Sequence, residues 1–307
     1  MRRVPRPWLR LRGDALALGS EDGTVRARVD GAWHAVHVPG ELNRVEWTVD
    51  GTTLVFTDGS REGPWLWDAQ RGARRLPLAR DEHAEYLASR FGVDNVIATA
   101  KDGRLSVHDL DGAHRFSATL WSYPMIAHTI VPHGDDRWAV LMRNRSDPND
   151  HLTVIDPRAL AADPDHGWRA AEYGTFSWDL GVGAAGGNLI ALYQDHDGQE
   201  DPDDDPDLLL GFTGVAMIDL PSKSVTHRYP GPAGLGSGAT VWADDRILRV
   251  EGCARAIEIA RDTAALTEHR GRATALDRAT GTIAVWTDAP AIELIAITGA
   301  RTVVELP

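Results

Sequence analysis

The side chains best suited to chemistry form a dense run of carboxylates between positions 195 and 207, where eight of 13 residues are Asp or Glu. Hard oxygen ligands of this kind suit Ca²⁺, the only cofactor that the sequence suggests. The spacing departs from an EF-hand loop, because Gly198 takes the fourth position and Pro206 the twelfth. A solvated acidic loop, or a surface for a basic partner, fits the same residues. The candidate metal ligands are Asp195, Asp197, Glu200 and Asp201.

A second candidate chemistry is a metal-assisted reaction that uses His128 and Asp179. Histidine and carboxylate side chains are common ligands of catalytic metals. Both residues lie in short strand-like stretches, but spacing cannot show that they converge on one point. Hydrogen bonding to the core or to channel water is the alternative for His128. The sequence therefore assigns no catalytic residue and leaves these two as candidates.

Two other signals have plain structural explanations. Residues 181–186 match the G-x-G-x-x-G pattern of dinucleotide-binding sites, but the sequence continues as a strand where that site requires a helix. These residues are therefore expected to form a glycine-rich hairpin. Cys253, the single cysteine, lies in a strand-like context and is expected to be a packed small residue.

The elements that would position such residues are short strands arranged as a repeat. In the clearest copy, alternating residues 45–49 lead through Asp50-Gly51 to residues 53–57, and a second turn leads to residues 64–68. Apolar alternation interrupted by Gly-containing turns is the signature of β-hairpins. Seven copies divide the 307 residues into units of about 44, the length of a four-stranded propeller blade. Residues 82–90 could form a short helix, but their place in the repeat predicts an inner strand.

Several copies end their third strand on an aspartate: Trp67-Asp68 in one, then Asp109, Asp156 and Asp219. The Trp-Asp pair resembles the signature of the WD-repeat superfamily in a degenerate, bacterial form, although no copy has that family's Gly-His pair. The resemblance implies a single all-β domain over residues 1–307, a seven-bladed β-propeller of four-stranded antiparallel blades. The expected blades cover about residues 8–40, 41–80, 81–121, 122–173, 174–232, 233–270 and 271–307.

The two ends of the chain leave the closure of the ring open. Residues 8–11 read as the inner strand of the first blade, and residues 301–306 as the outer strand of the last. The first blade must then meet the seventh by side-chain packing, or residues before position 8 must add a clasp.

Loop elaboration predicts a binding rim on blades 3 to 5. Two long segments interrupt the repeat between second and third strands, at residues 143–150 and 194–208. A third segment, residues 121–124, connects two blades. Loops of both kinds lie on the same face of a propeller. Long loops on a rigid scaffold commonly carry function, and Trp, Tyr and Arg are frequent anchors of interfaces. The predicted partner-binding residues are Trp121, Tyr123, Arg143, Arg145 and Asp147.

The formal net charge of −13 argues against general binding of nucleic acids or anionic membranes. A cytoplasmic location is expected, because no signal-like or membrane-spanning apolar run is found and a single cysteine allows no internal disulfide. The sequence favours a non-catalytic platform that binds a protein or peptide. A metal-dependent hydrolase or lyase with its site in the channel, and a small-ligand or glycan binder, are the alternatives. The oligomeric state is not predicted.

Overall fold

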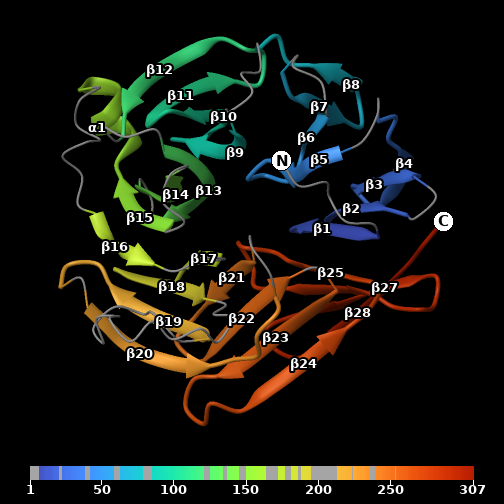
Figure 1. Cartoon of the computed structure of the whole chain (residues 1–307). Coiled ribbons are helices and arrows are strands. Elements are labelled where there is room, and N and C mark those ends of the chain that lie inside the picture. Colours follow the sequence, from blue (N-terminus) through green and yellow to red (C-terminus); the bar gives the residue numbers. More distant parts are fainter. Residues whose placement is uncertain are drawn as a thin grey trace.

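The computed structural model shows seven antiparallel sheets arranged in a ring (Figure 1), each with four strands in its described part. This confirms the predicted seven-bladed β-propeller. The structure describes residues 7–20, 23–38, 42–58, 63–78, 85–120, 125–133, 137–144, 150–163, 172–176, 181–185, 188–194, 213–222, 224–235, 239–252 and 254–307.

The first four blades are consecutive along the chain. Blade 1 comprises β1 (Trp8–Arg12), β2 (Ala15–Gly19), β3 (Val25–Val29) and β4 (Ala32–Ala35). Blade 2 comprises β5 (Leu42–Trp47), β6 (Leu54–Asp58), β7 (Trp65–Asp68) and β8 (Gly72–Arg75). Blade 3 comprises β9 (Glu85–Phe91), β10 (Asp94–Lys101), β11 (Arg104–Asp109) and β12 (His114–Thr119). Blade 4 comprises β13 (Met125–His133), β14 (Arg137–Asn144), β15 (Asp150–Ile155), the helix α1 (Pro157–Ala162) and β16 (Glu172–Phe176).

The last three blades complete the ring. Blade 5 comprises β17 (Gly181–Ala184), β18 (Leu189–Gln194), β19 (Gly214–Asp219) and β20 (Ser224–Pro230). Blade 6 comprises β21 (Thr240–Ala243), β22 (Ile247–Gly252), β23 (Arg255–Ala260) and β24 (Leu266–Arg270). Blade 7 comprises β25 (Ala273–Leu276), β26 (Ile283–Trp286), β27 (Ala291–Ile295) and β28 (Arg301–Glu305).

Strands in each sheet follow the order of the chain, with the first strand nearest the ring axis and the fourth outermost. The ambiguous stretch 82–90 therefore contains an inner strand, β9, as expected. Because the strands are antiparallel, the turns from first to second strand lie at one end of the ring, which we call the hairpin face. The loops from second to third strand and the connections between blades lie at the other end, which we call the connection face.

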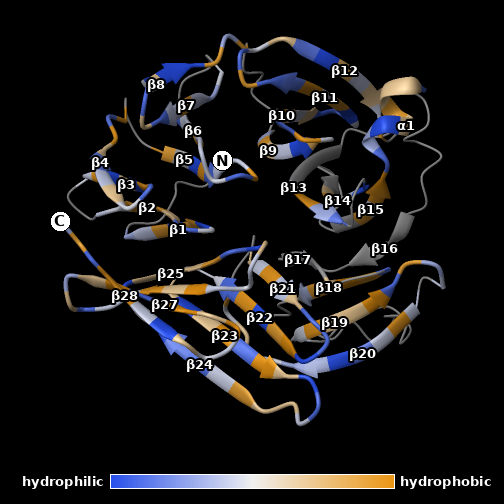
Figure 2. Cartoon of the chain, turned by 180° about the vertical axis from the view of Figure 1, so that it is seen from behind, coloured by the Kyte–Doolittle hydropathy of each residue, from blue (hydrophilic) through white to orange (hydrophobic). Residues whose placement is uncertain are grey.

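The core lies between blades, where middle strands bury both surfaces. β19 and β22 are buried along almost their whole length, whereas the outer strands β20 and β24 are largely exposed. Figure 2 shows the same contrast for these strands, with more hydrophobic colour on β19 and β22 than on β20 and β24. Each fully buried aliphatic or aromatic side chain stabilises the fold by about 1.5–3 kcal/mol. Burial of the middle strands between blades therefore stabilises the ring.

The aspartates that end third strands hold the turns to the fourth strands. Asp68 Oδ1 accepts hydrogen bonds from the backbone N–H groups of Gln70 (3.1 Å) and Arg71 (2.8 Å). Asp219 Oδ2 accepts one from the backbone N–H of Ser222 at 3.1 Å. The recurring aspartate thus has a local structural role, because an acceptor at this position satisfies donors that the turn leaves unpaired.

The same aspartate in blade 4 starts a helix that the repeat does not predict. Asp156 Oδ1 accepts from the backbone N–H groups of Arg158 and Ala159, and Pro157 occupies the first helical turn of α1. An N-capping Asp followed by Pro is a helix-start signal that lies outside the repeat pattern. Leu160 is fully buried in the cluster between blades 3 and 4 and anchors α1 there.

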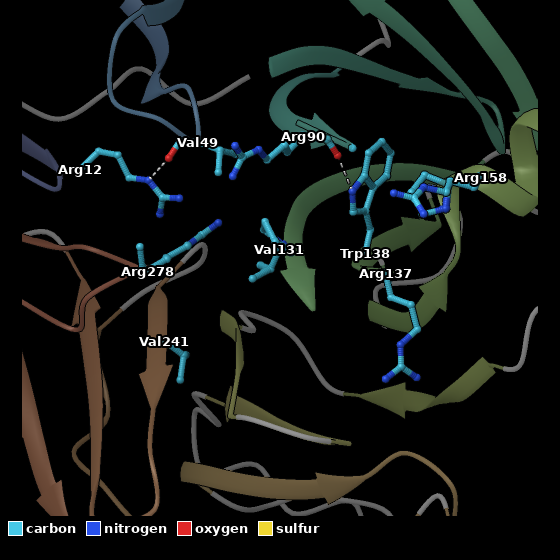
Figure 3. A pocket seen from close by; sticks show the side chains of 13 residues that line it. Arg12, Val49, Arg90, Val131, Arg137, Trp138, Arg158, Val241 and Arg278 are labelled. Atoms are coloured by element: carbon cyan, nitrogen blue, oxygen red, sulfur yellow. Dashed lines mark hydrogen bonds between the residues drawn. The ribbon is translucent and has the colours of Figure 1, made fainter. Parts of the chain in front are cut away.

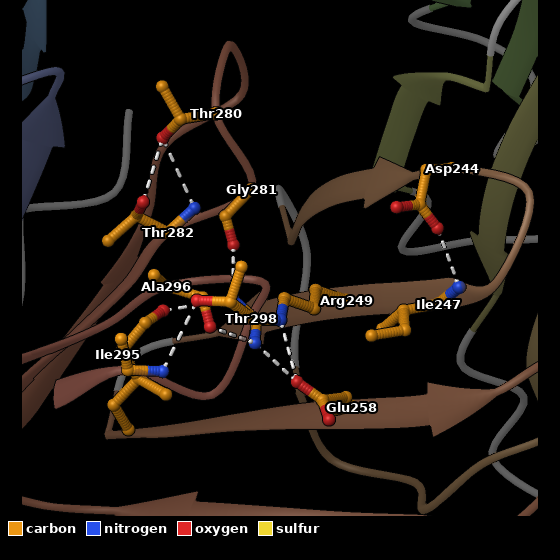
Figure 4. Close-up of polar contacts among 11 residues, drawn as sticks. Asp244, Ile247, Arg249, Glu258, Thr280, Gly281, Thr282, Ile295, Ala296 and Thr298 are labelled. Atoms are coloured by element: carbon orange, nitrogen blue, oxygen red, sulfur yellow. Dashed lines mark hydrogen bonds and ion pairs between the residues drawn. The ribbon is translucent and has the colours of Figure 1, made fainter.

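Blades 6 and 7 are joined by the buried Arg249 of β22, whose side chain is 1% exposed (Figure 4). Its Nε and Nη2 donate to Glu258 Oε2 at 2.8 and 2.5 Å. Its remaining donors reach three backbone carbonyls of blade 7, those of Gly281 (2.6 Å), Ile295 (2.9 Å) and Ala296 (3.0 Å). All five N–H donors of the guanidinium are therefore satisfied, and the two hydrogen bonds of Nη1, to the Gly281 and Ile295 carbonyls, are fully buried.

Side-chain packing closes the ring between blades 1 and 7, and no strand of one blade pairs with the other in the described residues. Leu9 and Leu11 of β1 share a buried cluster with Ala273 and Trp286. The Trp33 indole Nε1 adds a hydrogen bond to the Glu305 carbonyl at 3.1 Å. The described residues thus show packing between the two blades; residues 1–6, which the alternative clasp would use, lie outside them.

Asp277 is the polar centre of this closure. Its fully buried carboxylate accepts from the backbone N–H of Gly13 (3.0 Å) and lies 3.3 Å from Arg12 Nη1, both in blade 1. It also accepts from Ala279 N (3.0 Å) and Thr280 Oγ1 (2.7 Å) in its own turn. One side chain thus holds the β25–β26 turn and ties it to the first blade.

Asp277→Asn is expected to lower the free energy of unfolding by about 1–2 kcal/mol, because the amide replaces an acceptor oxygen with a donor and removes the ion pair. Urea denaturation followed by tryptophan fluorescence measures this loss. Asp245→Asn, the same change at an exposed turn residue of blade 6, is the matched control. Equal stability of the two variants would contradict the role given to Asp277.

Candidate functional site

A cavity of about 310 Å³ lies on the ring axis at the hairpin face. It touches six of the seven blades, and a space shared by so many blades can lie only at the centre of the ring. The described residues that line it are Arg12, Val49, Arg90, Gly92, Val131, Pro132, Arg137, Trp138, Pro157, Arg158, Val241, Arg278 and Ala279.

The charge of this lining is opposite to that of the whole chain. Five of the described lining residues are arginines and none is an aspartate or glutamate, whereas the chain has 45 acidic and 32 basic residues. The other lining residues are apolar or glycine. The cavity therefore combines a concentrated positive charge with apolar walls, within a protein of formal net charge −13.

Three of the arginines point toward one another across the cavity (Figure 3): Arg12 from blade 1, Arg90 from blade 3 and Arg278 from blade 7. Arg137 is directed away from this point, and its Nη2 donates to Asn188 Oδ1 of blade 5 at 3.2 Å. Arg158 lies on the far side of Trp138 in the same view. The first three residues, which we call the arginine triad, are therefore the arginines whose side chains meet in the cavity.

Arg12 and Arg90 are positioned by the ends of inner strands. Arg12 is the last residue of β1, and its Nε donates to the Val49 carbonyl at 2.6 Å, which fixes the side chain against blade 2. Arg90 lies near the end of β9, where its carbonyl accepts a hydrogen bond from Trp138 Nε1 at 2.8 Å. Its own Nε makes a long contact of 3.4 Å with the Val93 carbonyl. Both guanidiniums are thus carried by backbone that neighbouring blades hold in place.

Arg278 follows Asp277 in the β25–β26 turn, so the closure of the ring also sets its direction. Among the described residues, no hydrogen bond of its guanidinium is found. Burial lowers the pKa of Arg278 to about 10; the carboxylates of Glu46 and Glu251 oppose this shift, and the positive charges of Arg44 and Arg12 add to it. Arg278 remains charged at neutral pH but is held close to groups of its own sign.

A second set of charged groups lies behind the triad. Glu46 Oε1 accepts from the backbone N–H of Ala88 at 2.8 Å and lies 3.5 Å from Arg44 Nε, so it links blades 2 and 3. Glu251 of β22 is buried and accepts from Thr274 Oγ1 at 3.3 Å. Burial raises the pKa of Glu251 to about 7, although the positive charges of Arg10 and Arg278 and the Thr274 hydrogen bond favour its ionised form.

His133, at the end of β13 beside the cavity wall, contributes no second chemistry. The residue is 1% exposed, and neither ring nitrogen has a hydrogen-bond partner among the described residues. Burial, and next the positive charge of Arg137, lower the pKa of His133. The neutral imidazole is therefore favoured, and the side chain is buried next to the lining residue Pro132 in the chain.

The residues that the sequence singled out for function are not those of the cavity. Most of them lie outside the described residues: Trp121, Tyr123, Arg145, Asp147, Asp179, Asp195, Asp197, Glu200 and Asp201. His128 and Arg143 are placed only by their backbone, on β13 and β14. Their assignment to a binding rim, a calcium site or a catalytic site remains a prediction.

The predicted rim and the observed cavity are assigned to different faces of the ring. The rim was placed on the connection face, whereas the arginine triad lies on the hairpin face. Arg12 and Arg90 stand at or near the ends of first strands and Arg278 in a first-to-second turn, so no long loop marks these residues in the sequence.

Within the described residues, no group of three or more His, Cys, Asp or Glu side chains is arranged to hold a metal ion. Over the same residues, no helix has both the length and the apolar character that a bilayer crossing requires.

The chain matches no protein-family model and no curated protein, but its fold is shared by solved structures. Hydrazine synthase of Kuenenia stuttgartiensis has 13% identity and a TM-score of 0.60, over 98% of this chain and 96% of that one. PorZ, a surface component of the type-IX secretion system of Porphyromonas gingivalis, has 12% identity and a TM-score of 0.58. The match covers all of this chain, which spans 39% of the PorZ chain.

A chain of the mitotic checkpoint complex is also similar, with 13% identity and a TM-score of 0.55 over 98% of this chain and 86% of that one. These proteins include an enzyme, a secretion-system component and a member of a protein complex, so the shared fold does not select a function. At such low identity the likeness concerns architecture alone, and it agrees with the ring of blades described above: the chain is a β-propeller.

Proposed function

We propose that this chain is a non-catalytic interaction platform that binds an acidic segment of a partner protein at the arginine triad. The observation that carries the proposal is the convergence of Arg12, Arg90 and Arg278 on one cavity that has no carboxylate among its described lining residues. Guanidinium groups pair well with carboxylates, because their planar N–H forks match two acceptor oxygens.

The chemistry of the lining supports binding more than catalysis. Arginine stays protonated near neutral pH, so the triad cannot act as a general base. The described lining residues include no histidine, carboxylate, serine or cysteine that could act as a base or nucleophile. The walls instead offer apolar contact from Val131, Pro132 and Val241.

The rigidity of the site also supports a platform. Each triad member comes from a different blade, and the blades are fixed by buried clusters and by the hydrogen bonds of Arg12 and Trp138. A preformed site avoids the cost of ordering its side chains when a partner binds. A propeller chain in the mitotic checkpoint complex is an example of this fold within a protein assembly. The cytoplasmic location that the sequence suggests remains a prediction.

The proposal is tested with a fluorescently labelled hexaglutamate peptide. Arg90→Ala and Arg278→Ala are each expected to weaken its binding about tenfold, since one charge-assisted contact is lost. Fluorescence anisotropy gives the dissociation constants, and the affinity should fall steeply as salt is raised. Arg270→Ala, which removes an exposed arginine on the outer strand β24, is the matched control.

Melting curves of the variants check that the fold is retained. Tight binding that is insensitive to Arg90 and Arg278 would move the interaction away from the triad. No binding of the acidic peptide to the folded wild-type protein would refute the platform as proposed.

A further inference from the structure

The arginine triad has more hydrogen-bond donors than a carboxylate can use. Arg12 donates its Nε–H to the Val49 carbonyl and one Nη1–H to Asp277 Oδ1. Among the described residues, Arg90 donates only its Nε–H, to the Val93 carbonyl at 3.4 Å. The Arg278 guanidinium has no hydrogen-bond partner among the described residues. Most N–H groups of three guanidiniums therefore remain available around one point.

The directions of these donors matter as much as their number. A carboxylate is planar, and one arginine fork can occupy both of its oxygens. The triad approaches from blades 1, 3 and 7, so its forks reach the cavity from three separate directions. A phosphoryl group carries three terminal oxygens in a tetrahedral arrangement, each of which can accept from a different arginine.

The positive charge of the triad also favours a phosphoryl group over a carboxylate. Arg278 is held near Arg12 and Arg44, and burial adds to the cost of its charge. A phosphate monoester carries about −1.5 to −2 at pH 7, against −1 for a carboxylate, and so relieves more of the repulsion within the triad. The apolar residues Val131, Pro132 and Val241 lie beside the triad and suit the carbon atoms that carry the phosphoryl group.

The size of the cavity limits what enters it. A volume of about 310 Å³ is at the lower end of the range for ligand pockets, which is about 300–1,000 Å³. It fits one phosphorylated side chain or a small phosphate ester and excludes a folded domain or a duplex.

We infer that the arginine triad is a phosphoryl-binding site, and that the acidic segment bound by the platform presents a phosphorylated side chain to it. This inference rests on the proposed function and narrows the class of its partner. A free phosphate ester carries the same chemistry, so the experiment separates the two sources.

Four probes test the inference by fluorescence anisotropy and calorimetry. Three are labelled pentapeptides of one sequence with phosphoserine, glutamate or serine at the centre, and the fourth is glycerol phosphate. The phosphoserine peptide is expected to bind at least about tenfold more tightly than the glutamate peptide, and the serine peptide more weakly than both. Arg278→Lys should remove this preference, because lysine keeps the charge but loses the planar fork.

The matched control is Arg270→Lys on β24, which should leave all four affinities unchanged. Equal binding of the phosphoserine and glutamate peptides would refute the phosphoryl site while leaving the platform intact. Binding of glycerol phosphate without the phosphopeptide would support the phosphoryl site but overturn its assignment to a protein segment. Failure of every probe to bind folded protein would refute both proposals.

Discussion

Arg249→Ala is expected to lower the free energy of unfolding by about 3–5 kcal/mol. Removal of the guanidinium leaves Glu258 without its ion-pair partner and leaves the carbonyls of Gly281, Ile295 and Ala296 without their donor. Such groups lose their partners without regaining full hydration, and the deleted side chain also leaves a cavity. Denaturant unfolding monitored by circular dichroism and tryptophan fluorescence measures the loss.

Two further variants distinguish the loss of the Arg249 hydrogen bonds from a general effect of removing a positive charge. Arg246→Ala removes an exposed arginine from the neighbouring turn and is expected to change stability by about 0.5 kcal/mol or less. Arg249→Lys keeps the charge but cannot reach all the acceptors, so it should be destabilised nearly as much as the alanine variant. A stability of Arg249→Ala within error of the wild type would show that the junction between blades 6 and 7 does not depend on this side chain.

Glu251→Gln is expected to stabilise the protein by about 3 kcal/mol at pH 8 and to have little effect at pH 4. Burial raises the pKa of Glu251 from 4.5 to about 7. Between these values the folded state holds a proton that the unfolded state has released, so this group's contribution to stability is full below pH 4.5 and is lost as pH rises through 7. Glutamine keeps the neutral shape and the acceptor for Thr274 at every pH, and therefore avoids the loss.

The measurement is urea denaturation of the wild type and the variant at several values between pH 4 and pH 8. Glu305→Gln, at an exposed position of β28, is the control and should show no such pH dependence. An equal gain at both ends of the pH range would assign the effect to packing and not to the proton. A loss of stability at pH 8 would show that the ionised carboxylate is stabilised by Arg10 and Arg278 more than burial destabilises it.

The turns of the propeller were readable from the sequence because their determinants are local. Alternation along residues 45–49 defines two strand faces, residues 53–57 return as a buried strand, and Asp50-Gly51 between them supplies the turn, where Gly51 adopts a φ of 73°. Asp68 and Asp219 satisfy donors only two or three residues away. The Asp156-Pro157 signal is also local, but it lies outside the repeat pattern, and the helix α1 was not predicted.

The candidate site was not readable in this way, because its determinants are distant in the sequence. Arg12, Arg90 and Arg278 resemble the chain's other arginines when each is viewed with its neighbours. Their meeting depends on the number of blades, on the register of β1 and β9, and on a turn that Asp277 ties to blade 1.

The sequence by itself determined the repeat, the number of blades, the position of most strands and the residues that hold their turns. These features follow from side-chain alternation and from hydrogen bonds within a few residues. The tertiary structure alone decided that the ring closes by packing, that Arg249 is buried in a junction, and that positive charge gathers on the axis of an acidic protein. Each of these results depends on contacts between blades, and the geometry of such contacts is set only when all seven blades pack around one centre.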